Sequence, residues 1–318
     1  MCALSAVPAV SVASMKPDGA ETIRAALTRG QADTAMQMLD SALTADPNDA
    51  QALNLRCRVY YAEEQWDDAI GACERAKQIV PGNSDYHMWL GRAYGRKAQQ
   101  LSLMAAYKMA KLIRAEFETA ANLDPKNGEA LSDLGQFYAL APAIVGGGHG
   151  KAEAVARQLD GLSPVRALQL RAEIAEQKKD YAAAEAALRA KISLSHPAAQ
   201  AWMDLGSFYE RRQRWDEMLA ALNSGAAAAD HEHGPALADG AVVLMRAGRE
   251  PRLAMEWMRA YLGSNALSEE APAFVVHARI GTLLKQLGDA EGAEKEFEAA
   301  RTLAKDFSGS AGVKAGGR

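Results

Sequence analysis

One pattern of small and apolar residues occurs twice near the start of the chain, and the distance between the copies most constrains the fold. In each copy the pattern ends at a proline: it runs through Ala35, Leu39, Ala42 and Pro47, and then through Ala69, Cys73, Ala76 and Pro81. The two prolines are 34 residues apart. A period of this length predicts a solenoid of helix hairpins, in which each hairpin buries its apolar face against its neighbours.

The second copy shows how one hairpin is built. Apolar residues recur at helical spacing on two segments, with Leu53, Cys57 and Tyr60 on the first and Trp66, Ala69, Cys73 and Ala76 on the second. The small residues allow the two backbones to approach closely, and Pro81 ends the second helix. This pattern resembles the tetratricopeptide repeat family in its bacterial-type form, and the resemblance covers most of the chain.

Further copies extend the pattern toward the C-terminus. The best preserved of them contains Trp202, Leu205, Gly206, Tyr209, Trp215 and Leu222. Roughly seven or eight hairpins result, which is enough for a stable stack. The predicted fold is all-α, a right-handed superhelical solenoid of antiparallel helix hairpins over residues 20–307, with insertions near residues 97–106 and 141–150.

Composition agrees with close helix packing and argues against one class of partner. Hydrophobic residues make up 49% of the chain but aromatic residues only 6%. The formal net charge is −4, so the surface as a whole does not attract nucleic acid. We expect no nucleic-acid partner.

The two ends differ from the repeats. Residues 1–19 form a leader whose segment from Met1 to Ser14 resembles the cleavage region of a signal peptide, although no Lys or Arg precedes its apolar stretch. A start codon assigned too late would explain this absence. We favour a periplasmic or exported protein, with a disordered N-terminus on a cytoplasmic protein as the alternative. Residues 308–318 are predicted to be a disordered tail.

Cys57 and Cys73 face each other on the two helices of one predicted hairpin. A disulfide between them is geometrically conceivable. We favour the interpretation that both are small buried thiols, because this position of the repeat usually takes a small apolar residue.

Two motifs that suggest chemistry are weak. The glycine-rich stretch from Ala141 to Lys151 resembles a phosphate-binding loop, but it has Val145 where the first glycine is needed and Ala152 where a Ser or Thr would bind magnesium. We interpret it as a loop between two helices, with His149 on the surface. The pair His231 and His233 lacks the rest of a metal coordination sphere. An enzyme using these histidines is a remote alternative, and we expect no cofactor and no metal.

The resemblance implies a non-catalytic scaffold, because tetratricopeptide domains usually bind a peptide or helix of another protein in the concave groove lined by their first helices. Helical spacing places one set of side chains on the face opposite the packing stripe: Asn54, Arg58, Tyr61, Met88, Arg92, Arg96 and Gln136. The N-terminal part of this set is basic, and later units such as the one with Glu173 are more acidic. We therefore expect a protein or peptide partner with acidic groups.

A basic segment suggests an alternative function. From Tyr86 to Ala115 the sequence has no Asp or Glu, and its positive residues include Lys97, Lys108, Lys111 and Arg114. A basic amphipathic helix of this kind lies on an anionic membrane or binds an acidic partner. The chain would then be a peripheral membrane-surface or envelope adaptor. The competing interpretation is that the extra turns pack against the insertion from Ile144 to Gly150 and serve only the fold.

Overall fold

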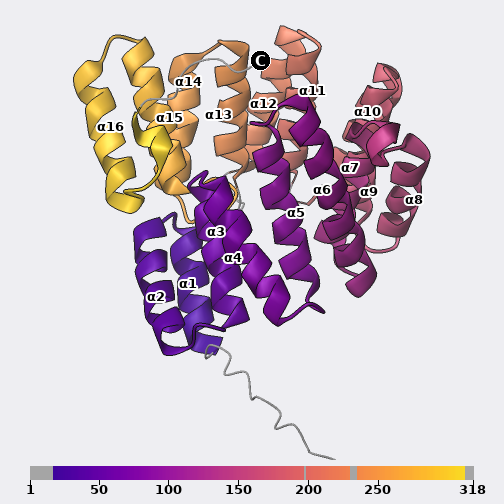
Figure 1. The fold of residues 1–318 in the computed structure, drawn as a ribbon. Coiled ribbons are helices and arrows are strands. Elements are labelled where there is room, and N and C mark those ends of the chain that lie inside the picture. Colours follow the sequence, from indigo (N-terminus) through magenta and orange to yellow (C-terminus); the bar gives the residue numbers. More distant parts are fainter. Residues whose placement is uncertain (1–16, 197, 230–234, 312–318) are drawn as a thin grey trace, which may run out of the picture.

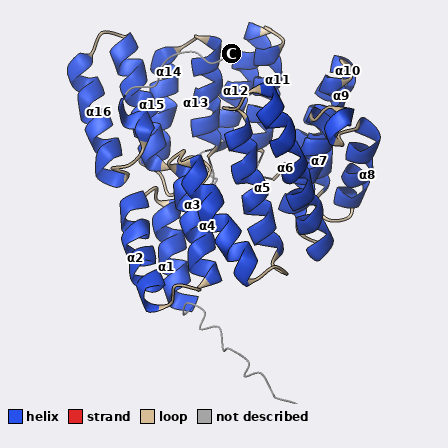
Figure 2. Cartoon of the chain, in the orientation of Figure 1, coloured by secondary structure: helices blue, strands red, loops and turns tan. Residues whose placement is uncertain are grey.

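The computed structural model describes residues 17–196, 198–229 and 235–311, and α-helices dominate these parts of the chain (Figures 1 and 2). Sixteen α-helices pair in chain order as eight antiparallel hairpins over the described ranges. They are α1 (Pro17–Thr28), α2 (Ala32–Ala45), α3 (Ala50–Ala62), α4 (Trp66–Ile79), α5 (Ser84–Ala98), α6 (Leu103–Leu123), α7 (Gly128–Leu140), α8 (His149–Asp160), α9 (Pro164–Gln177), α10 (Tyr181–Leu194), α11 (Ala199–Arg211), α12 (Trp215–Ala229), α13 (Ala236–Ala247), α14 (Pro251–Leu262), α15 (Ala273–Gln286) and α16 (Ala290–Leu303). The predicted all-α helical repeat is confirmed.

Small residues let the two helices of a hairpin come together. Ala69 and Ala76 are fully buried on α4. A Cβ added at Gly91 on α5 would lie 2.5 Å from the Phe117 ring of α6, and one at Gly281 would lie 2.8 Å from the Phe297 ring. Because any side chain at these glycines would push the aromatic ring away, the sequence repeats glycine at the same point of several hairpins.

Asp or Asn side chains cap the N-termini of several first helices. The Asp49 carboxylate accepts a hydrogen bond from the Ala52 N–H at 3.0 Å. The Asn83 and Asn127 side chains accept from the backbone at the starts of α5 and α7 in the same way. These caps satisfy N–H groups that have no partner within the helix, and so they fix where each repeat begins.

The superhelix brings its last hairpin back against its first, as Figure 1 shows for α16 and α2. The Lys305 N–H donates to the Asp33 carboxylate at 3.3 Å, and the Gln65 side chain donates to the Asp306 carbonyl at 3.2 Å. Gly30, in the turn after α1, lies so close to Ala273 that a Cβ would meet its backbone nitrogen at 2.3 Å. The solenoid therefore has buried contacts between its two ends as well as between neighbours.

The two predicted insertions adjoin each other. Helix α6 is 21 residues long, and a short 3-10 turn, η1 (Ala143–Val145), follows α7. The Arg114 guanidinium of α6 donates to the Val145 carbonyl at 3.3 Å. Val145 itself is buried, so the turn does pack on α6 in part.

The ends differ from the expected boundaries. Helix α1 begins at Pro17, so residues 17–19 belong to the first repeat and not to a leader. Residues 308–311 form a second 3-10 turn, η2 (Ser308–Ala311), where a disordered tail was expected. Residues 1–16 and 312–318 lie outside the described part, so the predictions of a signal peptide and of the remaining tail stay untested.

Cys57 and Cys73 form a disulfide, with their Cα atoms 5.3 Å apart. The favoured prediction of two free thiols is therefore wrong, although both residues are fully buried as expected. The reason is that α3 and α4 approach so closely that two facing cysteines are within bonding geometry.

Within the described ranges, none of the helices combines the length and the apolar character that crossing a bilayer requires.

Candidate functional site

First helices of the hairpins form the inner wall of the superhelix. Helix α3 contacts α5, α5 contacts α7, α7 contacts α9, and α11 contacts α13. Side chains on the exposed side of these helices share one concave surface, which we call the inner groove. The predicted groove residues lie on α3, α5 and α7, at its N-terminal end.

An aromatic cluster holds the predicted arginines at this end. Tyr61 packs edge-on against both Trp66 and Trp89, with ring centroids 5.4 and 5.5 Å apart. The Arg58 and Arg92 guanidinium carbons each lie 4.8 Å from the centroid of the Trp89 ring. Trp89 therefore separates two arginines, and each gains a cation–π contact.

Arg96 stacks on a second ring of the same cluster. Its guanidinium carbon lies 5.1 Å from the Trp66 centroid. The structure thus brings Arg58, Tyr61, Arg92 and Arg96 together around two tryptophan rings. Trp89 was missed, and the signal that would have found it is a tryptophan on a first helix directly beside the packing residue Leu90.

Carboxylates of the chain itself neutralise two of these arginines. Arg58 pairs with Glu269, with Nε to Oε1 at 2.9 Å. Arg92 donates to Asp133 at 2.5 Å and to Glu129 at 3.1 Å. The basic character that the sequence suggests is therefore largely compensated.

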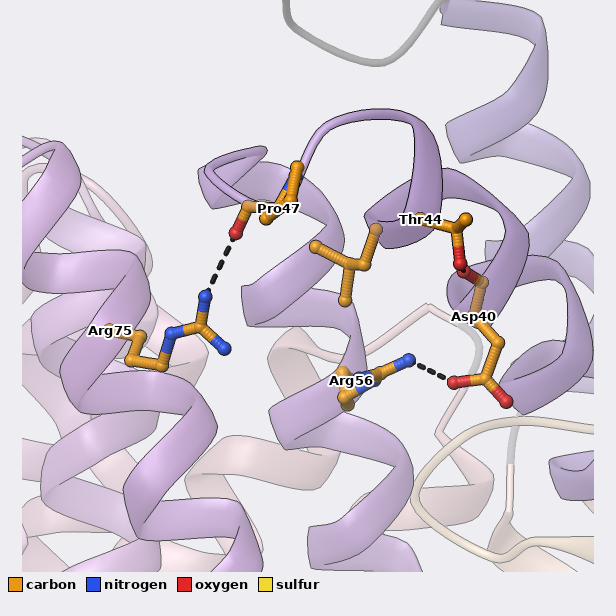
Figure 3. Close-up of a pocket in the computed structure, with 6 residues that line it drawn as sticks. Asp40, Thr44, Pro47, Arg56 and Arg75 are labelled. Atoms are coloured by element: carbon orange, nitrogen blue, oxygen red, sulfur yellow. Dashed lines mark hydrogen bonds and ion pairs between the residues drawn. The ribbon is translucent and has the colours of Figure 1, made fainter.

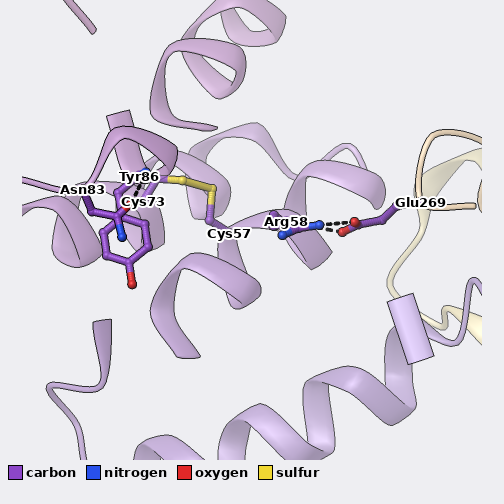
Figure 4. The surroundings of a disulfide bond; sticks show 6 residues. All are labelled: Cys57, Arg58, Cys73, Asn83, Tyr86 and Glu269. Carbon is purple, nitrogen blue, oxygen red and sulfur yellow. Dashed lines mark hydrogen bonds and ion pairs between the residues drawn. A yellow bond between two sulfur atoms is a disulfide. The ribbon is translucent and has the colours of Figure 1, made fainter. Parts of the chain in front are cut away.

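Glu269 reaches the groove from the loop between α14 and α15. Figure 4 shows Arg58 extending toward Glu269 while the neighbouring Cys57 turns to Cys73. The Tyr261 hydroxyl anchors this loop, because it donates to the Ala271 carbonyl and accepts from the Ser268 N–H, both at 2.8 Å. A segment near the C-terminus therefore covers part of the N-terminal groove.

Two of the predicted groove residues are not accessible. Asn54 is 5% exposed and Met88 is 3% exposed. Met88 packs with Ala120 and Ala130, between its own hairpin and the next. The expectation that these two side chains face a ligand is wrong, because adjacent hairpins cover more of each first helix than the helical spacing alone implies.

Farther along the groove, a cavity of about 450 Å³ opens between α7, α9 and α11. Amide, hydroxyl and charged groups line it, including Ser132, Asp133, Gln136, Arg166, Gln169, Glu173, Lys191 and Gln200. Gln136, the last of the predicted groove residues, lies here and is exposed. The cavity is a hollow in the inner wall that mixes donors and acceptors.

Buried carboxylates give this part of the groove its electrostatic character. Burial raises the pKa of Glu173, although its carboxylate accepts a hydrogen bond from Gln169 at 3.1 Å. Lys191 pairs with Asp204 and donates to the side-chain carbonyl of Gln169 at 2.8 Å. Burial also raises the pKa of Asp239 to about 6.

One acceptor beside these groups lacks a partner. Gln200 donates to Asp239 at 3.0 Å, while its Oε1 is buried without a hydrogen bond in the described part of the chain. Internal hydrogen bonds thus order the side chains that line the cavity, but one acceptor, Gln200 Oε1, has no hydrogen-bond partner in the described part of the chain.

A second, smaller cavity of about 300 Å³ lies between α2, α3 and α4 (Figure 3). Arg56 pairs with Asp40, and Arg75 donates to the Pro47 carbonyl at 2.9 Å. Both arginines thus connect neighbouring helices, and we assign this cavity a structural role.

The basic segment of the sequence divides into paired and unpaired cations. Lys97 pairs with Asp67 at 2.8 Å, and Arg114 bonds to the η1 turn. Lys108 and Lys111 are exposed on α6, where the Lys111 ammonium lies 4.7 Å from the Tyr107 centroid. The segment is therefore less basic at its surface than its composition suggests.

Of the two histidine motifs, the structure describes the one at His149. His149 begins α8 beside the glycine-rich loop. The pair at positions 231 and 233 lies outside the described residues. Among the residues that are described, no group of three or more His, Cys, Asp or Glu side chains is arranged to hold a metal ion.

Known structures share this fold. The chain is similar to yeast Tom70 with a TM-score of 0.55 and 14% identity, over 94% of this chain and 63% of that one. A thermophilic TPR protein of Thermus thermophilus matches with a TM-score of 0.49 and 19% identity, over 64% of this chain and 98% of that one. A tetratricopeptide repeat protein of Parabacteroides merdae matches with a TM-score of 0.46 and 13% identity, over 92% and 98%.

Comparisons of sequence match a smaller part of the chain than comparisons of structure do. No curated protein matches the chain. The tetratricopeptide repeat family model matches residues 26–93, which cover α2, α3, α4 and most of α5. Residues 26–93 therefore match the tetratricopeptide repeat family, and the described chain shares a helical-repeat fold with Tom70.

Proposed function

We propose that the protein is a non-catalytic scaffold that binds an extended peptide or a helix of another protein in the inner groove. The observation that carries this proposal is the cavity of about 450 Å³ shared by α7, α9 and α11. Three successive first helices contribute to it, so a ligand lying along the groove would contact several repeats at once. The tetratricopeptide family, whose members bind protein partners, supports the same function.

The chemistry of the cavity fits a peptide main chain. Gln136 offers an exposed side-chain amide, and the side-chain amides of Gln169 and Gln200 line the same cavity. A peptide segment carries one N–H donor and one carbonyl acceptor per residue, so amides that both donate and accept match it without selecting a single side chain. Glu173 lies beside them with no cation hydrogen-bonded to it within the described ranges, and it would favour a partner N–H or ammonium group.

At the N-terminal end of the groove, a contact within the chain opposes the binding of a partner. A carboxylate of an acidic partner at Arg58 would have to replace Glu269. The groove thus combines an arginine site that the chain itself occupies with a cavity that nothing in the described chain fills. We place the main contact in the cavity and an acidic partner group, if it binds, at Arg58.

The test blocks the cavity without disturbing the opposite face of the same hairpin. Gln136→Trp fills the hollow from α7, while Gln158→Trp adds the same side chain to an exposed position on α8. Affinity capture from native cell fractions, read by mass spectrometry, should recover a partner with wild type and with Gln158→Trp but not with Gln136→Trp. Equal recovery by all three forms would contradict binding in the cavity.

The disulfide supports a location for this function. Disulfides persist in oxidising compartments and are rare in the cytosol. We propose that the scaffold works outside the cytoplasm. Thiol labelling of Cys57 and Cys73 in protein that is taken directly from cells and unfolded without reductant tests this, because both residues are buried in the fold and their labelling under these conditions would contradict it.

A further inference from the structure

Large apolar side chains are exposed at two places on the insertions, where α6 begins and in the η1 turn. Leu103 is 87% exposed and Met104 is 72% exposed. Ile144, in the η1 turn, is 74% exposed. The insertions thus cover Val145 but leave these three side chains in solvent, so mutual packing does not account for them.

The first exposed residues of α6 continue along the helix into a row of basic side chains. Leu103, Tyr107, Lys111 and Arg114 follow each other at spacings of three or four residues and so form one row along α6. Arg114 at the end of this row donates to the Val145 carbonyl, directly beside Ile144. Leu140, at the end of α7, is 53% exposed next to the same turn. We call the surface formed by Leu103, Met104, Lys108 and Lys111 the α6 tip.

The exposed charges of the tip itself are positive, and the exposed carboxylate of Asp67 pairs with Lys97 at the end of α5. Lys108 and Lys111 are exposed, and no Asp or Glu occurs from Tyr86 to Ala115. The next carboxylates along α6 are engaged within the fold. Glu116 bonds to His87 at 2.6 Å and to Lys77 at 2.8 Å, and Glu118 accepts from the Tyr138 hydroxyl at 2.8 Å.

We propose that the α6 tip docks on an anionic membrane surface. Aliphatic side chains that project from a helix end enter the acyl boundary, while adjacent lysines contact anionic headgroups. A lipid surface receives such projecting groups without a complementary pocket, whereas a protein partner would need one. This function goes beyond partner binding in the inner groove, because it uses a different surface and a different ligand.

The experiment measures co-sedimentation with vesicles of phosphatidylcholine containing phosphatidylglycerol, against vesicles of phosphatidylcholine alone. Wild type should bind the anionic vesicles more strongly. Lys108→Glu/Lys111→Glu and Leu103→Ser/Met104→Ser should each reduce that binding at least about tenfold, since each variant removes one of the two contributions.

Matched controls change the same residue types elsewhere. Lys178→Glu/Lys285→Glu reverses two exposed lysines away from the tip, and Leu194→Ser/Leu287→Ser removes two exposed leucines. Both controls should bind the vesicles like wild type. The proposal is overturned if wild type does not bind anionic vesicles, or if the tip and control variants lose vesicle binding equally. It is also overturned if the tip variants bind vesicles like wild type and lose only the binding of an acidic protein partner.

Discussion

The Arg58 guanidinium pairs side-on with the Glu269 carboxylate, although 211 residues of sequence separate them. The pair joins the second hairpin to the loop before the last one, and about a fifth of each side chain remains exposed. The same pair therefore connects the two ends of the superhelix and occupies Arg58, where a partner carboxylate would bind in the N-terminal groove.

Glu269→Gln removes the charge of this pair while keeping the shape of the side chain. We expect a loss of stability of about 1.5–3 kcal/mol, the range for hydrogen bonds to charged groups, and stronger binding of any partner carboxylate at Arg58. A double-mutant cycle with Arg58→Gln, read by urea unfolding, measures the coupling. Additive losses in the cycle would show that the two side chains do not stabilise each other.

The sequence predicts the hairpins but not the pairing of Arg58 with Glu269, for a physical reason. Contacts within one hairpin, such as Gly91 against Phe117, follow from local spacing, so the 34-residue period is enough to predict them. The contact of Glu269 with Arg58 depends on the rotation accumulated over all intervening repeats. Small rotations per repeat are not encoded in any single residue pattern.

The burial of Met88 and the exposure of Leu103 have a similar explanation. Helical spacing gives the direction of a side chain around its own helix but not how far a neighbouring hairpin extends over it. Met88 is covered by the next hairpin, while the first turn of α6 extends beyond its neighbours. Two free thiols were wrongly favoured over the Cys57 to Cys73 bond, because spacing places two cysteines face to face without deciding their oxidation.

Ala69→Leu tests the close approach of α3 and α4. Ala69 is fully buried, so three extra carbons must force the helices apart at a cost of about 1–3 kcal/mol. Thermal unfolding followed by circular dichroism measures the loss. Ala186→Leu, at an exposed site of α10, is the matched control and should melt like wild type. If both variants melted alike, the packing account of this hairpin would be wrong.

Removing the disulfide should destabilise the fold. The bond closes a loop with a sequence separation of 16 residues, for which the chain-entropy model gives about 3 kcal/mol. Urea unfolding of wild type with and without a reductant measures the difference. Cys57→Ala/Cys73→Ala should be insensitive to the reductant. An unchanged wild-type curve after full reduction would show that the bond adds nothing to stability.

Stability should also depend on pH through Glu63. Burial raises the pKa of Glu63 to about 7, with Asp306 and Asp33 acting in the same direction and Lys305 opposing them. Because the folded-state pKa lies above the ordinary value of 4.5, this group's contribution is full below that value and is lost as the pH rises through about 7. The difference in melting temperature between wild type and Glu63→Gln, followed across this range, isolates the effect. A pH-independent difference would mean that Glu63 does not titrate in the closed interface.

Contacts between the two ends should respond in the same pH range. Glu63 lies beside Asp33 and the segment with Lys305 and Asp306, where the last hairpin meets the first. Hydrogen exchange of the Lys305 amide, which donates to Asp33, should speed up between about pH 4.5 and 7 by more than the intrinsic rate increases, and only at the intrinsic rate above pH 7. In Glu63→Gln the extra acceleration should disappear, and its persistence there would assign it to another group.

The most direct test of the central claim is photo-cross-linking from two matched positions in one hairpin. A photoreactive side chain replaces either Gln136, in the inner cavity, or Gln158, on the outer face, and both positions are exposed. Binding in the groove predicts one discrete cross-linked protein from position 136 and none from position 158. The same product from both positions, or a product from position 158 alone, would contradict it.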